Sequence, residues 1–317
     1  LTELHTGGYD LEFMPGALPS TSLTKLYFTN FNQPITPGTL PSSIIKINTG
    51  NMFNQWLEPG SLPSRLETLI FGDNFDSPLD HDILPSSLTK LSFGHYFDQW
   101  LEPGHLPQSL RILKLGVFFN KKLQVGSLPP SLQSLRLSNV YNQELEPMVL
   151  PHSITHLFIG YIYQQSLNNV DIMPSSLTSI LYQNNLFDLV GPDSFKHCRI
   201  NNIQQQRNDP KSKLIIPNNI NIFRGHLRTF KINLYQYHFG EIDQSTSTST
   251  STSTSTSTSN IFQQFKEAEI FQLILESIRV TIIIRKIDND NLLLFFNQSR
   301  MIFVTWDILQ RKNYESL

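Results

Sequence analysis

A Leu-Pro pair recurs along the first half of the chain at a constant interval. Consecutive pairs are 22 residues apart, and a Met-Pro pair at Met173 follows the last of them after 23 residues. Their leucines are Leu18, Leu40, Leu62, Leu84, Leu106, Leu128 and Leu150. A unit this short cannot bury its own apolar side chains, and stacking copies of it builds a shared core. The repeat therefore predicts a solenoid over residues 1–190.

Each unit combines one short strand with two corners. In the unit 84–105, Leu91-Ser92-Phe93 shows the period-2 alternation of a strand with one buried face. Gly94 follows this strand, and we interpret it, like Gly72, Gly116 and Gly160, as a residue that tolerates a positive φ. Pro103-Gly104 is typical of a type II turn at the next corner.

These patterns predict one continuous parallel sheet with one strand per unit. The expected strand centres are Leu26, Ile47, Leu69, Leu91, Leu113, Leu135, Leu157 and Ile180. The fold class is therefore mainly β: a leucine-rich-repeat-like solenoid, followed by a disordered Ser/Thr linker and a small C-terminal α+β tail.

The segment Phe31-Asn32-Gln33-Pro34 and the residues after it, as far as Ile44, resemble the FNIP repeat, a 22-residue relative of the leucine-rich repeat. The resemblance covers roughly residues 1–190, although later copies of the signature decay, as at Tyr141-Asn142. It implies a leucine-rich-repeat-like solenoid, a non-catalytic binding module and no enzyme activity of its own.

Two columns of side chains recur at fixed register. The first is aromatic, and we interpret it as a buried spine rather than an aromatic binding box: Phe31, Phe53, Phe75, Phe97, Phe119, Tyr141 and Tyr163. The second follows it directly, and we expect it to form a ladder that binds neighbouring turn backbones, as the leucine-rich-repeat asparagine ladder does: Asn32, Asn54, Asp76, Asp98, Asn120 and Asn142.

The remainder of the chain falls into three parts. We interpret 191–244 as degenerate repeats or a C-terminal cap, with Phe195, Cys198 and Ile200 in apolar repeat positions. Residues 245–259 alternate Ser and Thr and predict a disordered linker. Residues 260–317 form a tail in which 271–278 fit a helix, 279–284, 292–296 and 301–306 fit strands, and 288–291 a turn.

Composition narrows the class of partner. Lys and Arg number 24 against 26 Asp and Glu, so the net charge of −2 gives no reason to expect nucleic acid as a partner. No apolar run approaches the ~18 residues of a membrane span. The single Cys198 excludes an internal disulfide, and with no signal-peptide pattern we expect a cytoplasmic, intracellular protein. The chain opens at Leu1 inside a repeat, so we expect residues to be missing before it.

No catalytic, cofactor-binding or metal site is expected, and no cofactor. His152 and His156 are four residues apart, but Pro151 and a strand beginning at Ile154 should make them project differently. The sequence 288–293 starts like a calcium loop and then lacks its oxygen ligand and glycine. We expect Cys198 to be a buried, inert thiol rather than a nucleophile.

The candidate binding face consists of outward positions on the predicted strands, two and four residues after the strand-entry Leu or Ile. From Leu23 to Leu177 these positions hold five cations and no acid: Lys25, Lys46, Lys90, Lys114 and Arg136. Arg199 and Lys231 would extend this cationic face, whereas Glu58, Glu102 and Glu146 share a slot elsewhere.

Several interpretations of the cationic face remain open. The first is an intracellular module that binds an unknown protein partner. The second is a binder of an anionic or phosphorylated ligand. The third is that the chain is a truncated copy without function. The fourth is that lysine simply suits exposed strand positions and carries no binding role. An enzyme is not expected.

Overall fold

The computed structural model describes residues 1–8, 10–183, 186–191 and 194–205, together with five strands between residues 229 and 305. The chain divides into two compact units, Leu1–Leu177 and Thr178–Leu317. The predicted Ser/Thr linker at 245–259 and the calcium-like turn at 288–290 lie outside the described residues.

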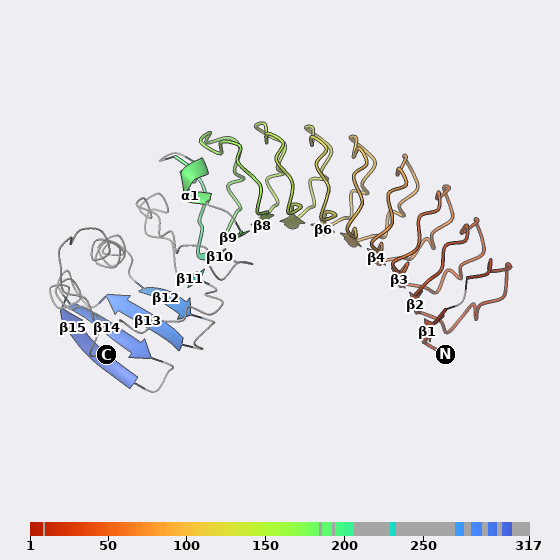
Figure 1. The fold of residues 1–317 in the computed structure, drawn as a ribbon, viewed down its shortest axis with the longest axis horizontal. Coiled ribbons are helices and arrows are strands. Elements are labelled where there is room, and N and C mark those ends of the chain that lie inside the picture. The colour runs from red at the N-terminus through yellow and green to blue at the C-terminus, as the bar shows by residue number, and fades with distance from the viewer. Residues whose placement is uncertain are drawn as a thin grey trace, which may run out of the picture. The chain divides into compact units, whose positions relative to one another are not determined.

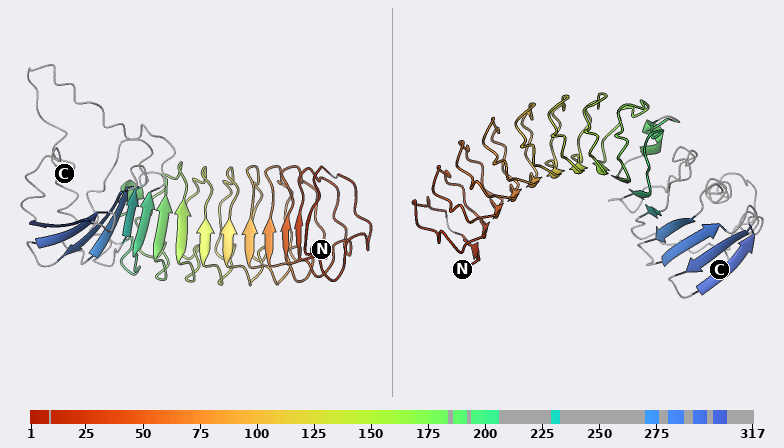
Figure 2. Two further views of the ribbon diagram at one scale, coloured as in Figure 1. Left: turned by 90° about the horizontal axis from the view of Figure 1, so that it is seen from below. Right: turned by 180° about the vertical axis from the view of Figure 1, so that it is seen from behind.

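The first unit is a stack of parallel strands with one strand per repeat. Its strands are β1 (Glu3–His5), β2 (Lys25–Tyr27), β3 (Lys46–Asn48), β4 (Thr68–Ile70), β5 (Lys90–Ser92), β6 (Ile112–Lys114), β7 (Ser134–Arg136) and β8 (His156–Ile159). Neighbours pair in chain order and in repeat register, as Leu69 with Leu91 and Leu91 with Leu113. The strands of this unit lie along the inner side of its curve and point the same way (Figures 1 and 2). The predicted strand centres are confirmed.

The core of the first unit lies behind the sheet. The central residue of each strand points inward, so Leu91 is fully buried while its neighbour Lys90 is exposed. The aromatic column is the buried spine predicted from the sequence: Phe97 stacks on Phe75 at 6.0 Å and on Phe119 at 6.1 Å between ring centroids.

The column beside the spine forms the predicted ladder. The Asp98 backbone N–H donates to Oδ1 of Asp76 at 2.9 Å, and the Asn120 N–H donates to Oδ1 of Asp98 at 2.7 Å. The same bond recurs from Asp10 to Gln164. Sequence patterns did not predict a second ladder, in which Ser87 Oγ donates to the Leu66 carbonyl at 2.7 Å and its counterparts follow.

The glycines at the Pro-Gly corners and those that follow the strands are required for different physical reasons. Gly104 has φ of 94°, and the His105 N–H donates to the Glu102 carbonyl at 3.1 Å, which confirms the turn. The positive φ expected at Gly94 is wrong. A Cβ there would lie 2.1 Å from the carbonyl oxygen of Gly72, so close packing of consecutive units excludes a side chain. Gly72 and Gly160 are crowded in the same way, and Gly116 slightly less.

The second unit begins with parallel strands and ends with antiparallel ones. Its elements are β9 (Ser179–Tyr182), α1 (Leu186–Leu189), β10 (Asn202–Gln205), β11 (Thr229–Ile232), β12 (Ile270–Leu275), β13 (Val280–Lys286), β14 (Asn291–Phe296) and β15 (Arg300–Thr305). Pairing is parallel from β9 to β12 and antiparallel from β12 to β15. Ile180, the last predicted strand centre, lies in β9.

Two expectations for the second unit are wrong. The segment 270–275 is strand β12 rather than the start of a helix at 271–278, because its apolar residues also suit a strand and pairing with β11 and β13 decides the outcome. Phe195, Cys198 and Ile200 are buried as expected. The second error is the position of the strand that follows them, which lies later than the repeat pattern indicated, since Ile203 of β10 pairs with Ile180.

Candidate functional site

The outward residues of β2–β8 form one continuous surface, called here the strand face. One row holds Lys25, Lys46, Thr68, Lys90, Ile112, Ser134 and His156, and the other holds Tyr27, Asn48, Ile70, Ser92, Lys114, Arg136 and Phe158. All five residues of the cationic face lie on it, as the alternation of side chains requires.

Three of the five cations contact a neighbouring unit. Lys25 Nζ lies 3.4 Å from Glu3 Oε2 of β1. Lys46 Nζ lies 5.1 Å from the ring centroid of Tyr27. The Arg136 guanidinium lies over the Phe158 ring, with 3.6 Å between Cζ and the ring centroid, and burial lowers the pKa of Arg136. These contacts give the cations a packing role beside their charge.

Lys90 and Lys114 differ from the other three. Both are exposed, and among the described residues neither forms a salt bridge. They lie on adjacent strands, where Lys90 pairs in register with Ile112 and Lys114 pairs with Ser92. Two ammonium groups are therefore available to a ligand at the middle of the strand face.

Arg199 does not extend this face as expected, whereas Lys231 keeps an outward register position, in line with Leu181 of β9 through Gln204 of β10. Arg199 is exposed but precedes β10, whose residues next to Ile203 are Asn202 and Gln204. Lys231 lies in β11, in register with Gln204. The strand entry lies later in the second unit than the sequence pattern indicated, which displaces Arg199 from the sheet.

Acidic residues gather at a different edge of the repeat. Glu58, Glu102 and Glu146 are exposed at the corner before the turn. Glu146 Oε1 accepts a hydrogen bond from Lys122 Nζ at 2.6 Å, which raises the pKa of Lys122. Cations on the sheet and carboxylates at the corner are thus segregated within the same units.

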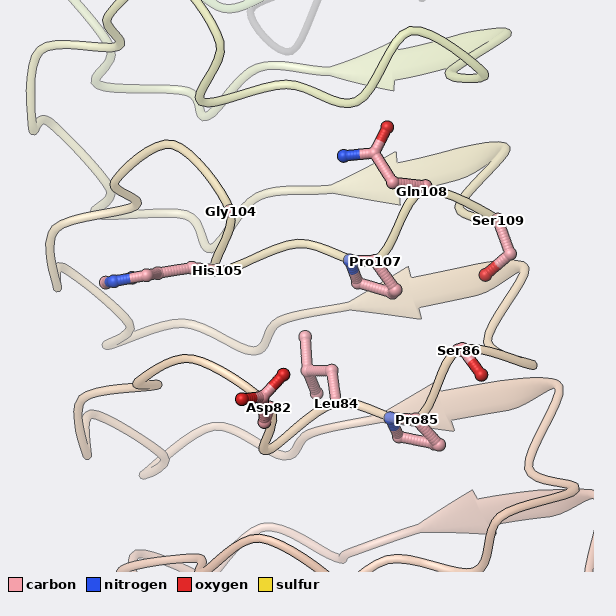
Figure 3. A pocket seen from close by; sticks show the side chains of 9 residues that line it. All are labelled: Asp82, Leu84, Pro85, Ser86, Gly104, His105, Pro107, Gln108 and Ser109. Carbon is pink, nitrogen blue, oxygen red and sulfur yellow. The ribbon is translucent and has the colours of Figure 1, made fainter.

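A shallow hollow of about 380 Å³ lies between two successive units near these corners (Figure 3). Its polar side chains do not converge: His105 and Gln108 point in different directions. His105 Nδ1 already accepts the Glu102 N–H at 3.4 Å, and Ser109 Oγ donates to the Leu88 carbonyl at 2.7 Å. The hollow therefore holds no nucleophile paired with a base.

The other candidate metal-binding and catalytic residues do not form a site either. His156 lies on β8 and His152 in the turn before it, and the described residues contain no group of three or more metal-ligating side chains. Cys198 is buried, and burial raises its pKa to about 11. Within the described ranges, no helix is long and apolar enough to cross a membrane.

Sequence reasoning missed an exposed apolar column. The residue directly before each spine aromatic is Met52, Tyr96, Phe118, Val140 or Ile162 in five units. Four of these side chains are 42–56% exposed, and Val140 is half-buried. We call this column the apolar ridge. Asn30 and Asn74 fill the same slot in two other units, so this outward slot accepts polar residues, and apolar ones there are the signal.

Comparisons with known proteins agree with this architecture. The solved structure of CroV588, described as a novel circular LRR protein, is similar at 29% sequence identity and a TM-score of 0.54. The match covers 73% of this chain and 36% of that one, so this chain spans about a third of the length of CroV588. A search of curated proteins finds no matching relative. The family model described as FNIP Repeat matches residues 9–52, 53–96, 97–140 and 141–181, more than half of the chain. The chain therefore belongs to the FNIP repeat family.

Proposed function

We propose that the chain is a non-enzymatic binding scaffold whose strand face receives an acidic segment of a partner protein. One observation carries the proposal: the outward positions of β2–β8 hold five cations and no carboxylate. The strands are fixed by hydrogen bonds between units, so the backbone positions that carry the cations are set before a ligand arrives. FNIP and leucine-rich-repeat-like solenoids are non-enzymatic kinds of fold, which supports a binding role.

A phosphorylated ligand is a second candidate, favoured by the hydroxyls beside the cations. Ser92 pairs in register with Lys114, which in turn pairs with Arg136, and Ser134 lies on the same strand as Arg136. A hydroxyl, an ammonium and a guanidinium together are a donor set that suits phosphate oxygens. Competition by inorganic phosphate separates this candidate from the first.

The test is binding of a labelled poly-glutamate peptide to the full chain, followed by fluorescence anisotropy. We expect the double variant Lys90→Glu/Lys114→Glu to bind about tenfold more weakly or worse, and binding of the natural sequence to fall with added salt. Arg136 is left unchanged because it packs on Phe158, so its removal would also affect folding.

The matched control is Lys121→Glu/Lys122→Glu, which changes the net charge equally at loop positions. There Lys121 pairs with Asp98 at 3.1 Å and Lys122 with Glu146 at 2.6 Å. Equal losses in the two double variants would reduce the effect to net charge and refute the strand face as the site. Equal binding of a poly-glutamine peptide would refute an acidic partner.

A further inference from the structure

The apolar ridge is an exposed line of large side chains on a rigid support. Tyr96 is 56% exposed, Phe118 47% and Ile162 42%, and each directly precedes a fully or almost fully buried spine ring. The Tyr96 and Phe118 rings stack at 5.6 Å. Contiguous exposed apolar side chains of this size, bordered by polar residues, mark interaction sites on soluble proteins.

The ridge presents side chains and no free strand edge. The Tyr96 N–H donates to the Asp73 carbonyl at 2.9 Å, the Phe118 N–H to the His95 carbonyl at 2.9 Å, and the Ile162 N–H to the Asn139 carbonyl at 3.0 Å. A partner that added a strand would need backbone N–H groups that are still unpaired, and these three are not. A helix satisfies its own backbone hydrogen bonds, and so it is the form of peptide that suits this ridge.

At Tyr96 and Phe118 the step of the ridge is near the pitch of a helix. One turn of an α-helix rises about 5.4 Å, and the Tyr96 and Phe118 ring centroids are 5.6 Å apart, against 6.1 Å for the spine rings Phe97 and Phe119 of the same two units. Side chains on one face of an extended strand are about 6.6–6.8 Å apart, a longer step than either of these distances. A helix lying along the stack would place one apolar side chain against each unit.

The lysines near the ridge indicate which charge the docked helix carries. Lys114 is the last residue of β6 and precedes Phe118 by four residues, and Lys90 is the first residue of the adjacent β5. From these observations we infer that the apolar ridge docks an amphipathic helix of a partner protein, with carboxylates along the flank that faces the strand face. The acidic flank rests on the function proposed above, whereas the apolar stripe stands on the ridge alone.

The test uses a designed helical peptide of about five turns, with leucines on one stripe and glutamates beside it. Its controls are a peptide of the same composition with the leucines scattered around the helix, and one with lysines in place of the glutamates. We expect the first peptide to bind the full chain and both controls to bind at least about tenfold more weakly.

Variants assign the contact to the ridge. Tyr96→Ser/Phe118→Ser should weaken binding of the designed peptide at least about tenfold and leave poly-glutamate binding unchanged. Tyr161→Ser, a 63% exposed residue beside the ridge, is the control for loss of exposed aromatic surface. Circular dichroism and melting curves of each variant separate lost binding from lost folding.

Each outcome supports or overturns the inference. Equal binding of the scattered peptide, or unchanged binding to the ridge variant, overturns it. If poly-glutamate binds through Lys90 and Lys114 while the designed peptide ignores the ridge, the proposed function stands and this inference fails. If the lysine-flanked peptide binds as well as the glutamate-flanked one, the acidic flank fails. Ridge-dependent self-association in analytical ultracentrifugation would replace the helix with a second copy of this chain.

Discussion

Replacing Phe97 with alanine tests whether the aromatic spine holds the stack together. The ring is fully buried and stacks on Phe75 and Phe119 at 6.0 and 6.1 Å and on Phe93 at 3.7 Å. Removing a buried phenylalanine costs about 3–5 kcal/mol, because the cavity adds to the lost transfer free energy. With a urea m-value of roughly 2–3 kcal/mol/M, the unfolding midpoint should fall by about 1–2.5 M.

The matched control is Phe118→Ala, which removes the same side chain one unit further along. Phe118 is 47% exposed and stacks on Tyr96, itself exposed, so its loss should cost less than about 1 kcal/mol. Urea unfolding followed by circular dichroism compares the two variants. Equal midpoints would refute the spine as the main source of stability. The stability would then come from contacts that both variants keep.

Three further substitutions and reactions probe the backbone and the thiol. Gly94→Ala should destabilise the first unit by at least about 3 kcal/mol because its Cβ would meet a carbonyl, whereas Gly8→Ala, with nothing within 4 Å, should melt unchanged. Met148→Gly should raise stability by about 0.5–1 kcal/mol in a thermal melt, since φ of 67° strains any side chain, and a lower melting temperature would contradict this. Cys198 in the native protein should react with a disulfide reagent at pH 8 roughly 100-fold more slowly than in urea, because burial raises its pKa to about 11, and equal rates would show an accessible thiolate.

The strands, the spine and the asparagine ladder of the first unit were predictable because each depends on one slot of a repeated unit. Leu91 and Phe97 illustrate this: their neighbours are their own counterparts, so the pattern also reports the contact. The apolar ridge was predictable in principle, since Phe118 stands in a slot that is asparagine in other units. It was missed because exposure of a loop residue follows from the path of the backbone and not from periodicity.

The errors have local causes. The crowding at Gly94 depends on how near one unit approaches the next, a distance that no sequence period contains. At β12, apolar residues at 270–275 fit both a helical and an extended period, and the partner strands decide between them. In the second unit, a strand entry at Ile200 instead of Phe195 moved β10 along the chain and took Arg199 off the sheet.

The asparagine ladder has a consequence for how such a chain changes length during evolution. Every acceptor serves the backbone one unit away, so duplication or loss of a whole repeat leaves each remaining junction chemically identical. A one-residue change of spacing is tolerated between the first two full units, where Leu26 pairs with Ile47 after 21 residues while Phe31 and Phe53 of the spine remain 22 residues apart. The corner also tolerates such a change: one extra residue precedes Met173, and the turn from Asn169 to Ile172 still closes with a 3.2 Å hydrogen bond. Genes of this kind can therefore lengthen in whole repeats and vary at their corners while the stack persists.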